Sequence, residues 1–229
     1  MRKNWQAWLA AAVSACLLEL PFPIAGPMPP WRSIFAWFGL VPLLWAILAS
    51  DPPSSPADGP GSPDLPSQRH PLRRAFLLAY FCGVLWYMGN CYWIYDTMLI
   101  HGGLPPAVSF LILLLFSLVL GGYSGLFGLG LALVHRATGS VRRALAFAPF
   151  LWVALELAGA RITSVPWDQL GYSQVDVGFA NLLAPWTGVY GVSFAIVALN
   201  ALYALPWVRT TKSIAKSNQF APRTFRWRL

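Results

Sequence analysis

Residues 107–134, AVSFLILLLFSLVLGGYSGLFGLGLALV, run for 28 positions without a charged side chain. A bilayer core about 30 Å thick requires roughly 20 helical residues for one crossing. A run this long and this apolar predicts a transmembrane helix. The whole chain agrees, because 57% of its 229 residues are hydrophobic and only 10% are charged. A soluble domain normally carries about 25% charged residues.

Other apolar segments precede and follow this run, and the second of them is interrupted by Pro42. Backbone amides in lipid must be bonded within the protein, which leaves helices or a closed barrel. No segment shows the alternation of a barrel strand. The sequence therefore predicts an all-α, polytopic integral membrane helical bundle with about six transmembrane helices. The six predicted helices are approximately 5–20, 34–50, 75–96, 107–134, 144–160 and 189–208.

The basic side chains indicate how such a bundle is oriented. In a six-helix topology, 14 of the 16 basic residues fall on one side, and only Arg32 and Arg161 fall on the other. Since cytoplasmic loops are enriched in Lys and Arg, both termini are predicted to be cytoplasmic, with 209–229 as a basic tail. The net charge of +8 then indicates a collar beside anionic lipid headgroups, and we expect no nucleic-acid partner.

Two sequence features are interpreted as structural. Residues 51–71 are rich in Pro, Ser and Gly without apolar periodicity, which predicts a disordered cytoplasmic linker. Gly121, Ser124, Gly125 and Gly128 are small residues at four-residue spacing, which predicts a close approach of two helix backbones.

Metal and cofactor chemistry is not indicated. The three cysteines (Cys16, Cys82 and Cys91) fall in apolar segments without a CxxC pair, and His101 has no second ligand at metal spacing. No Ser-His-Asp, GxSxG, Walker or HExxH pattern occurs. We expect no metal, no cofactor and no catalytic residue in this chain.

The connection 161–188, on the side opposite the basic collar, is the richest in polar residues. Its Trp and Tyr residues, each taken alone, are typical of an interfacial aromatic belt. Its Asp and Gln side chains fit a belt less well and indicate a platform that binds a lipid headgroup or seats another domain. The predicted rim residues are Trp167, Asp168, Gln169, Tyr172, Gln174, Trp186 and Tyr190.

Two polar residues lie inside predicted helices. A carboxylate such as Glu156 is costly there unless it is paired, neutral or near an interface, so a structural bracket and a functional acid both remain open. Arg161 is its nearest candidate partner, but a five-residue spacing places it off the same helix face. Asn90 is expected to bond another helix.

Six motifs occur in a recognisable order: LPFPIAG (20–26), GNCYWIY (89–95), HGGLPP (101–106), PFLWVALE (149–156), PWDQLGYSQ (166–174) and LAPWTGVYGVSFAIVALNAL (183–202). Together they resemble the N-terminal membrane region of bacterial apolipoprotein N-acyltransferase, over roughly residues 15–205. Two departures from the family pattern stand at Gly159, which replaces the Arg of Glu-x-x-Arg, and at Ser164-Val165, which replace Gly-Phe before Pro-Trp.

The resemblance implies a multi-pass protein of the bacterial inner membrane and a two-step acyl transfer. A cysteine thiolate takes a fatty acyl chain from a phospholipid, and the α-amino group of a diacylglyceryl-cysteine on an apolipoprotein then accepts it. In the family, a Glu-Lys-Cys triad in a nitrilase-like domain after a seventh helix performs this chemistry. We therefore expect this chain alone to be inactive, as a product of truncation, frameshift or gene splitting.

Two other functions are compatible with the residues. A non-catalytic membrane module could use the bundle to bind a lipid or a partner. A small transporter is a weaker alternative, because intramembrane charge is scarce and no paired, interrupted half-helices are visible.

Overall fold

The computed structural model describes residues 4–22, 29–49, 71–178 and 182–220. These residues form helices and connections, with no strand among them, so the predicted all-α bundle is confirmed. The predicted linker 51–71 lies outside the described residues except for Pro71. The elements are α1 (Asn4–Glu19), η1 (Pro30–Trp37), α2 (Val41–Leu48), α3 (Pro71–Asn90), α4 (Tyr92–Asp96), η3 (Thr97–His101), α5 (Pro106–Thr138), α6 (Val141–Ile162), η4 (Leu170–Gln174) and α8 (Ala184–Phe220).

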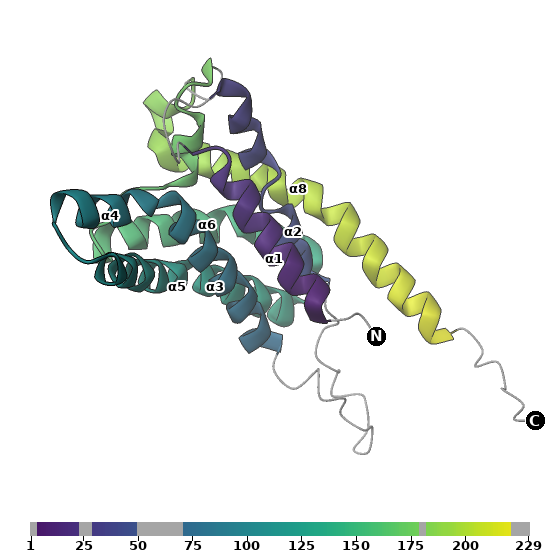
Figure 1. Cartoon of the computed structure of the whole chain (residues 1–229). Helices are drawn as coiled ribbons and strands as arrows, with labels where there is room; N and C mark the ends of the chain where they lie inside the picture. Colours follow the sequence, from purple (N-terminus) through teal and green to yellow (C-terminus); the bar gives the residue numbers. More distant parts are fainter. Residues whose placement is uncertain (1–3, 23–28, 50–70, 179–181, 221–229) are drawn as a thin grey trace, which may run out of the picture.

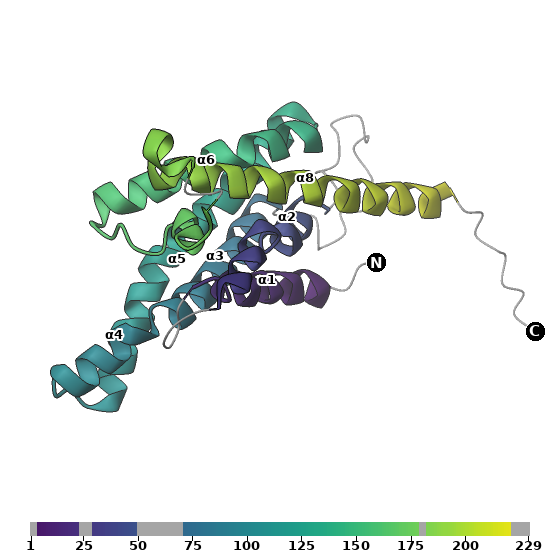
Figure 2. The same cartoon turned by 90° about the horizontal axis from the view of Figure 1, so that it is seen from above.

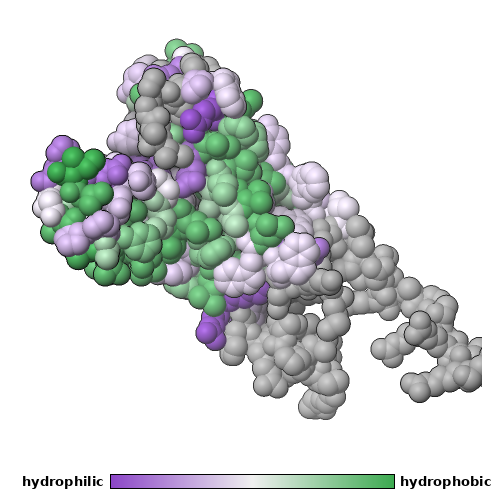
Figure 3. All heavy atoms as spheres, viewed as in Figure 1, coloured by the Kyte–Doolittle hydropathy of each residue, from purple (hydrophilic) through white to green (hydrophobic). Residues whose placement is uncertain are grey.

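Several of these helices have the length and composition of membrane spans. Within the described ranges, four stretches qualify: Trp31–Leu48, which covers η1 and α2, then α5, α6 and the Ala184–Thr210 part of α8. The bent pair formed by α3 with α4 and η3 would make a fifth. With 16 residues, α1 is just below the usual range of about 17 to 25. Six crossings therefore remain a prediction. On the face seen in Figure 3, hydrophobic residues form a band with hydrophilic residues toward both of its ends.

The ends of the helices are sorted into two groups. The beginnings of α1, α3 and α6 and the ends of α2, α5 and α8 lie toward one end of the molecule in both views (Figures 1 and 2). Arg73 and Arg142 lie in the first turns of α3 and α6, and Arg209 lies in the C-terminal half of α8, in agreement with the charge pattern. The segment around η4 and the start of α8 lie toward the opposite end (Figure 1). The cytoplasmic location of the basic end remains a prediction.

The second predicted helix is broken, and two side chains from other helices satisfy its freed backbone. The Ser14 hydroxyl of α1 donates to the Gly39 carbonyl at 2.6 Å and accepts from the Leu43 amide at 3.0 Å. The Asn200 side chain of α8 accepts from the Leu40 amide at 2.8 Å and donates to the Ala36 carbonyl at 2.8 Å. Irregular backbone is tolerated at membrane depth only when buried partners satisfy it in this way.

Glycines allow α3 and α5 to pack closely, as the small-residue spacing predicted. A Cβ atom placed on Gly128 would lie 2.5 Å from both the Ala75 carbonyl oxygen and the Ala79 Cβ. A Cβ on Gly121 would lie 2.7 Å from a methyl group of Val84. These separations are shorter than van der Waals contact, so the α3–α5 interface requires glycine at both positions.

We expect Gly128→Ala to lower the free energy of unfolding by about 1–3 kcal/mol, because the added methyl forces the α3 backbone away. The matched control is Gly122→Ala, where nothing lies within 4 Å of the added atom. That variant should be neutral or stabilised by up to about 1 kcal/mol through helix propensity. Unfolding in detergent, followed by circular dichroism, measures both. Equal effects of the two substitutions would contradict the close packing.

Two other helices differ from their expected bounds. The predicted 75–96 helix breaks at Cys91, where the chain turns by 51° into α4 and η3. The last helix begins at Ala184, kinks at Gly188 with φ 63°, and continues beyond residue 208 to Phe220. Beyond the kink, α8 contacts η4, where the Gly171 amide donates to the Ser193 hydroxyl.

Candidate functional site

The connection between α6 and η4 has an unusual backbone. Ser164 and Asp168 adopt φ values of 55° and 58°, in the left-handed region that non-glycine residues rarely occupy. Asp tolerates this conformation better than Ser does. Such strain persists only where the surroundings fix the chain, and it clusters at functional sites.

Glu156 is one of the groups that fix this connection. Its Oε1 accepts hydrogen bonds from the Trp152 indole at 2.7 Å and from the Leu170 amide at 2.8 Å. The next amide, of Gly171, donates to the Ser193 hydroxyl of α8 at 2.9 Å. The carboxylate therefore acts as a bracket that joins η4 to α6, while the proposed partner Arg161 is exposed on the surface.

Gln174 is the second fixing group, and it lies in the interior. Its side chain is 1% exposed. It accepts from the Trp37 indole at 3.0 Å and donates to the Ser33 carbonyl at 2.9 Å and the Ser173 hydroxyl at 2.8 Å. Gln174 thus ties η4 to η1, more than 130 residues away in the sequence, and does not present its amide to a ligand.

Asp168 contacts the break between α3 and α4, and Gln169 contacts α8. The Asp168 Oδ2 accepts from the Cys91 thiol at 2.9 Å, and Gln169 Nε2 donates to the Tyr190 hydroxyl at 3.1 Å. Burial raises the pKa of the Asp168 carboxyl above its usual range, while the bond from Cys91 acts in the opposite direction. Trp167 packs edge to face on Trp93, with ring centroids 5.4 Å apart.

The remaining predicted residues are distributed differently. Trp167 and Tyr172 are each 47% exposed, and Trp186 is 88% exposed, so these rings lie on the surface. Asn90 is buried, and its Nδ2 has no hydrogen-bond partner in the described part of the chain. The expected interhelical bond from this atom is therefore not observed.

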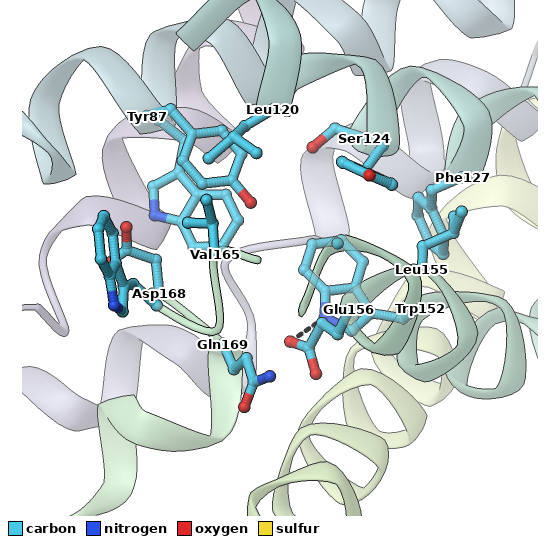
Figure 4. Close-up of a pocket in the computed structure, with 14 residues that line it drawn as sticks. Tyr87, Leu120, Ser124, Phe127, Trp152, Leu155, Glu156, Val165, Asp168 and Gln169 are labelled. Carbon is cyan, nitrogen blue, oxygen red and sulfur yellow. Dashed lines mark hydrogen bonds between the residues drawn. The ribbon is translucent and has the colours of Figure 1, made fainter. Parts of the chain in front are cut away.

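A cavity lies where α3, α5, α6 and the connection 163–169 meet (Figure 4). It offers about 40 Å³ for the centres of water-sized molecules, which is room for a few waters. Predicted residues contribute Glu156, Trp167, Asp168 and Gln169. Its other lining residues are Trp86, Tyr87, Leu120, Tyr123, Ser124, Phe127, Trp152, Leu155, Gly159 and Val165.

Sequence reasoning missed the aromatic walls of this cavity. The spacing of Trp152 and Glu156, one helical turn apart, is a signal that could have found one of them. Trp86 and Tyr87 gave no such signal, because aromatic residues are common throughout the apolar segments. Among the residues the structure describes, no group of three His, Cys, Asp or Glu side chains is placed to hold a metal ion.

Comparisons with known proteins agree on one family. Residues 14–202 match the family model of the apolipoprotein N-acyltransferase N-terminal domain. An apolipoprotein N-acyltransferase of Geobacter metallireducens is 33% identical over 196 residues, which cover 85% of this chain and 32% of the relative. That of Verminephrobacter eiseniae is 32% identical over 206 residues, covering 88% of this chain and 36% of the relative.

The chain spans about a third of the length of the curated relatives it matches. The matched region includes the spans from α2 to α6, the connection with η4 and most of the apolar part of α8. This chain therefore belongs to the apolipoprotein N-acyltransferase N-terminal domain family.

Proposed function

We propose that the chain is the membrane portion of an apolipoprotein N-acyltransferase of the bacterial inner membrane. The reaction transfers a fatty acyl chain from a phospholipid to the N-terminal diacylglyceryl-cysteine of a lipoprotein. The observation that carries this proposal is the family match over residues 14–202, which includes the outer connection.

We propose further that this chain does not catalyse the transfer alone. A nucleophilic thiol must be accessible and ionised next to a base or a cation. Cys82 and Cys91 are buried, and the partner of Cys91 is the carboxyl of Asp168, which disfavours a thiolate. Cys16 is a free, exposed thiol on α1, and no His, Lys or Glu side chain forms a hydrogen bond with it within the described residues. The resemblance instead assigns the chemistry to a nitrilase-like domain.

The connection 161–188 is proposed to be the outer rim on which the catalytic domain sits and past which acyl chains enter. Two kinds of observation support this role. Trp167, Tyr172 and Trp186 are exposed rings, and large aromatic side chains are preferred at the wet edge of a membrane and at protein interfaces. The buried bonds of Glu156 and Gln174 hold the backbone beneath these rings in one shape.

The test uses a full-length relative, with Ala placed at the positions that match Trp167 and Tyr172. We expect acyl transfer to fall by about threefold to tenfold per substitution, since removing an interfacial ring commonly costs about 1 kcal/mol or more. Protein levels should not change. The matched control places Ala at the position that matches Leu115, an exposed residue of α5. This variant should retain full activity. Unchanged transfer in the rim variants would contradict this role and show that the rings form only an interfacial aromatic belt.

A further inference from the structure

A groove lies where α1, the break between η1 and α2, and α8 meet. It offers about 410 Å³ for the centres of water-sized molecules, against about 40 Å³ for the cavity of Figure 4. One wall is α8, from Leu202 to Trp207, and the other wall includes Leu17, Phe38 and Pro42. Ligand sites typically have volumes of about 300–1,000 Å³, so the groove has room for part of a lipid.

The groove is apolar and belongs to membrane-spanning segments. Its walls come in part from Trp31–Leu48 and Ala184–Thr210, which both have the length and composition of spans. All of its lining residues are Leu, Val, Pro or aromatic. The α8 wall is open to the surroundings, with Tyr203 50% exposed and Trp207 66% exposed. An occupant of this groove therefore needs an apolar chain.

The end of the groove toward the basic end of the bundle carries a positive charge. Arg209 follows Leu202 by seven residues, which is two helical turns, so both lie on one side of α8. Thr210 follows Trp207 by three residues, and both Arg209 and Thr210 are exposed. No acidic residue occurs in α8, so the helix supplies no carboxylate to neutralise Arg209.

The distance between the apolar and the charged part matches one leaflet of a bilayer. From Leu202 to Arg209 the helix rises about 10 Å, and half of a bilayer core is about 15 Å thick. Tyr203 and Trp207 belong to the two residue types that favour the headgroup level. An acyl chain in the groove would therefore bring its phosphate to Arg209 and Thr210.

We propose that the groove holds one anionic phospholipid from the leaflet at the basic end, with an acyl chain against α8 and α2 and the phosphate at Arg209 and Thr210. Basic side chains beside grooves between membrane helices favour anionic headgroups. A zwitterionic lipid has the same chains and phosphate, but its ammonium group offsets the attraction to Arg209. The groove's charged end lies away from the connection 161–188 (Figure 1), so this lipid is a bound component, and the proposal does not depend on acyl transfer.

Native mass spectrometry of the purified chain in detergent tests the proposal. The probes are phosphatidylglycerol and phosphatidylcholine with identical palmitoyl and oleoyl chains, added in equal amounts. We expect one phosphatidylglycerol to be retained per chain, with a preference of about fivefold over phosphatidylcholine, because one basic side chain near an anionic headgroup contributes about that factor.

Two variants separate the charged end of the groove from its apolar part. Arg209→Gln should reduce the preference to about twofold or less, while Arg161→Gln, an exposed residue near the other end of α6, should keep it. Leu202→Trp fills the groove and should lower retention of both lipids by at least about threefold, because apolar contact is lost. Its control, Leu115→Trp on the exposed surface of α5, should retain them. Melting temperatures should stay within a few degrees of the parent.

Each outcome decides the proposal. A preference that depends on Arg209, together with weaker retention in Leu202→Trp, supports it. Equal retention of the two lipids by the parent, or a preference that survives in Arg209→Gln, would overturn the anionic selectivity. Unchanged retention in Leu202→Trp would overturn the groove as the site. A dimer that Leu202→Trp dissociates would also overturn it and assign the groove to a second copy of the chain.

Discussion

Replacing Asn200 by Leu is expected to lower the free energy of unfolding by about 2–4 kcal/mol. The side chain is fully buried on α8 and makes three hydrogen bonds, with the Leu40 amide, the Ala36 carbonyl and the Ile196 carbonyl. The Leu40 amide lies at the break between η1 and α2, where no preceding helical turn satisfies it. Leu at position 200 would leave this donor buried without a partner.

The matched control for this substitution is Ser117→Ala. Ser117 is also fully buried in a helix, but its hydroxyl donates only to the carbonyl of Leu113 in the preceding turn at 2.8 Å. Its removal orphans no backbone donor and should cost less than about 1 kcal/mol. Unfolding in sodium dodecyl sulfate–detergent mixtures, followed by tryptophan fluorescence, compares the two. Equal losses would show that the break is stabilised by something other than Asn200.

Replacing Gln174 by Leu is expected to cost a similar amount, about 2–4 kcal/mol. Three bonds to Trp37, Ser33 and Ser173 would be lost. Since these bonds tie η4 to η1, the outer connection should also become more sensitive to limited proteolysis, even before global unfolding. The combined measurement is unfolding free energy together with the rate of cleavage between residues 163 and 178.

Tyr172→Ala is the matched control, because Tyr172 lies in the same turn but is exposed. Its unfolding free energy should change by less than about 0.5 kcal/mol, as for most surface substitutions. The pair also separates two roles within PWDQLGYSQ, a buried tie and an exposed rim. A stable, protease-resistant Gln174→Leu variant would contradict the structural role assigned to this residue.

The sequence predicted those features that depend on local pattern. Long apolar runs predicted the all-α bundle because lipid leaves the backbone no alternative to internal hydrogen bonds. The four-residue spacing of Gly121 with Gly125, and of Ser124 with Gly128, predicted a close helix contact, which the α3–α5 interface confirms. The six-helix topology places most basic residues on one side of the bundle. The helix ends that this topology assigns to that side lie together in the structure (Figure 1).

Features that depend on contacts between distant segments were not predictable in this way. Gln174 looked like a rim residue, but its partners are Ser33 and Trp37, and no local pattern indicates so distant a pairing. For Glu156, charge alone pointed to Arg161, whereas the donors are the Trp152 indole, the Leu170 amide and the Ser193 hydroxyl. In a low-dielectric interior, neutral donors can satisfy a carboxylate without a countercharge.

The connection 161–188 owes its shape to these distant contacts. Glu156 fixes its end at Leu170, Ser193 fixes Gly171, and Gln174 fixes the last turn of η4. A Cβ on Gly171 would lie 2.4 Å from the Val189 carbonyl oxygen, so the close approach to α8 also requires glycine. A shaped surface of this kind is better suited to seating a partner or guiding a lipid than a mobile loop would be.

The most direct test of the account is the sidedness of this connection. Asp176→Cys and Arg142→Cys, each in a Cys16→Ser background, place single accessible thiols at exposed positions at opposite ends of the bundle. A membrane-impermeant maleimide applied to intact spheroplasts should label Cys at position 176 and leave Cys at position 142 unlabelled until the membrane is opened. Labelling at 142 alone, or at both positions alike, would contradict an outer rim opposite a basic cytoplasmic end.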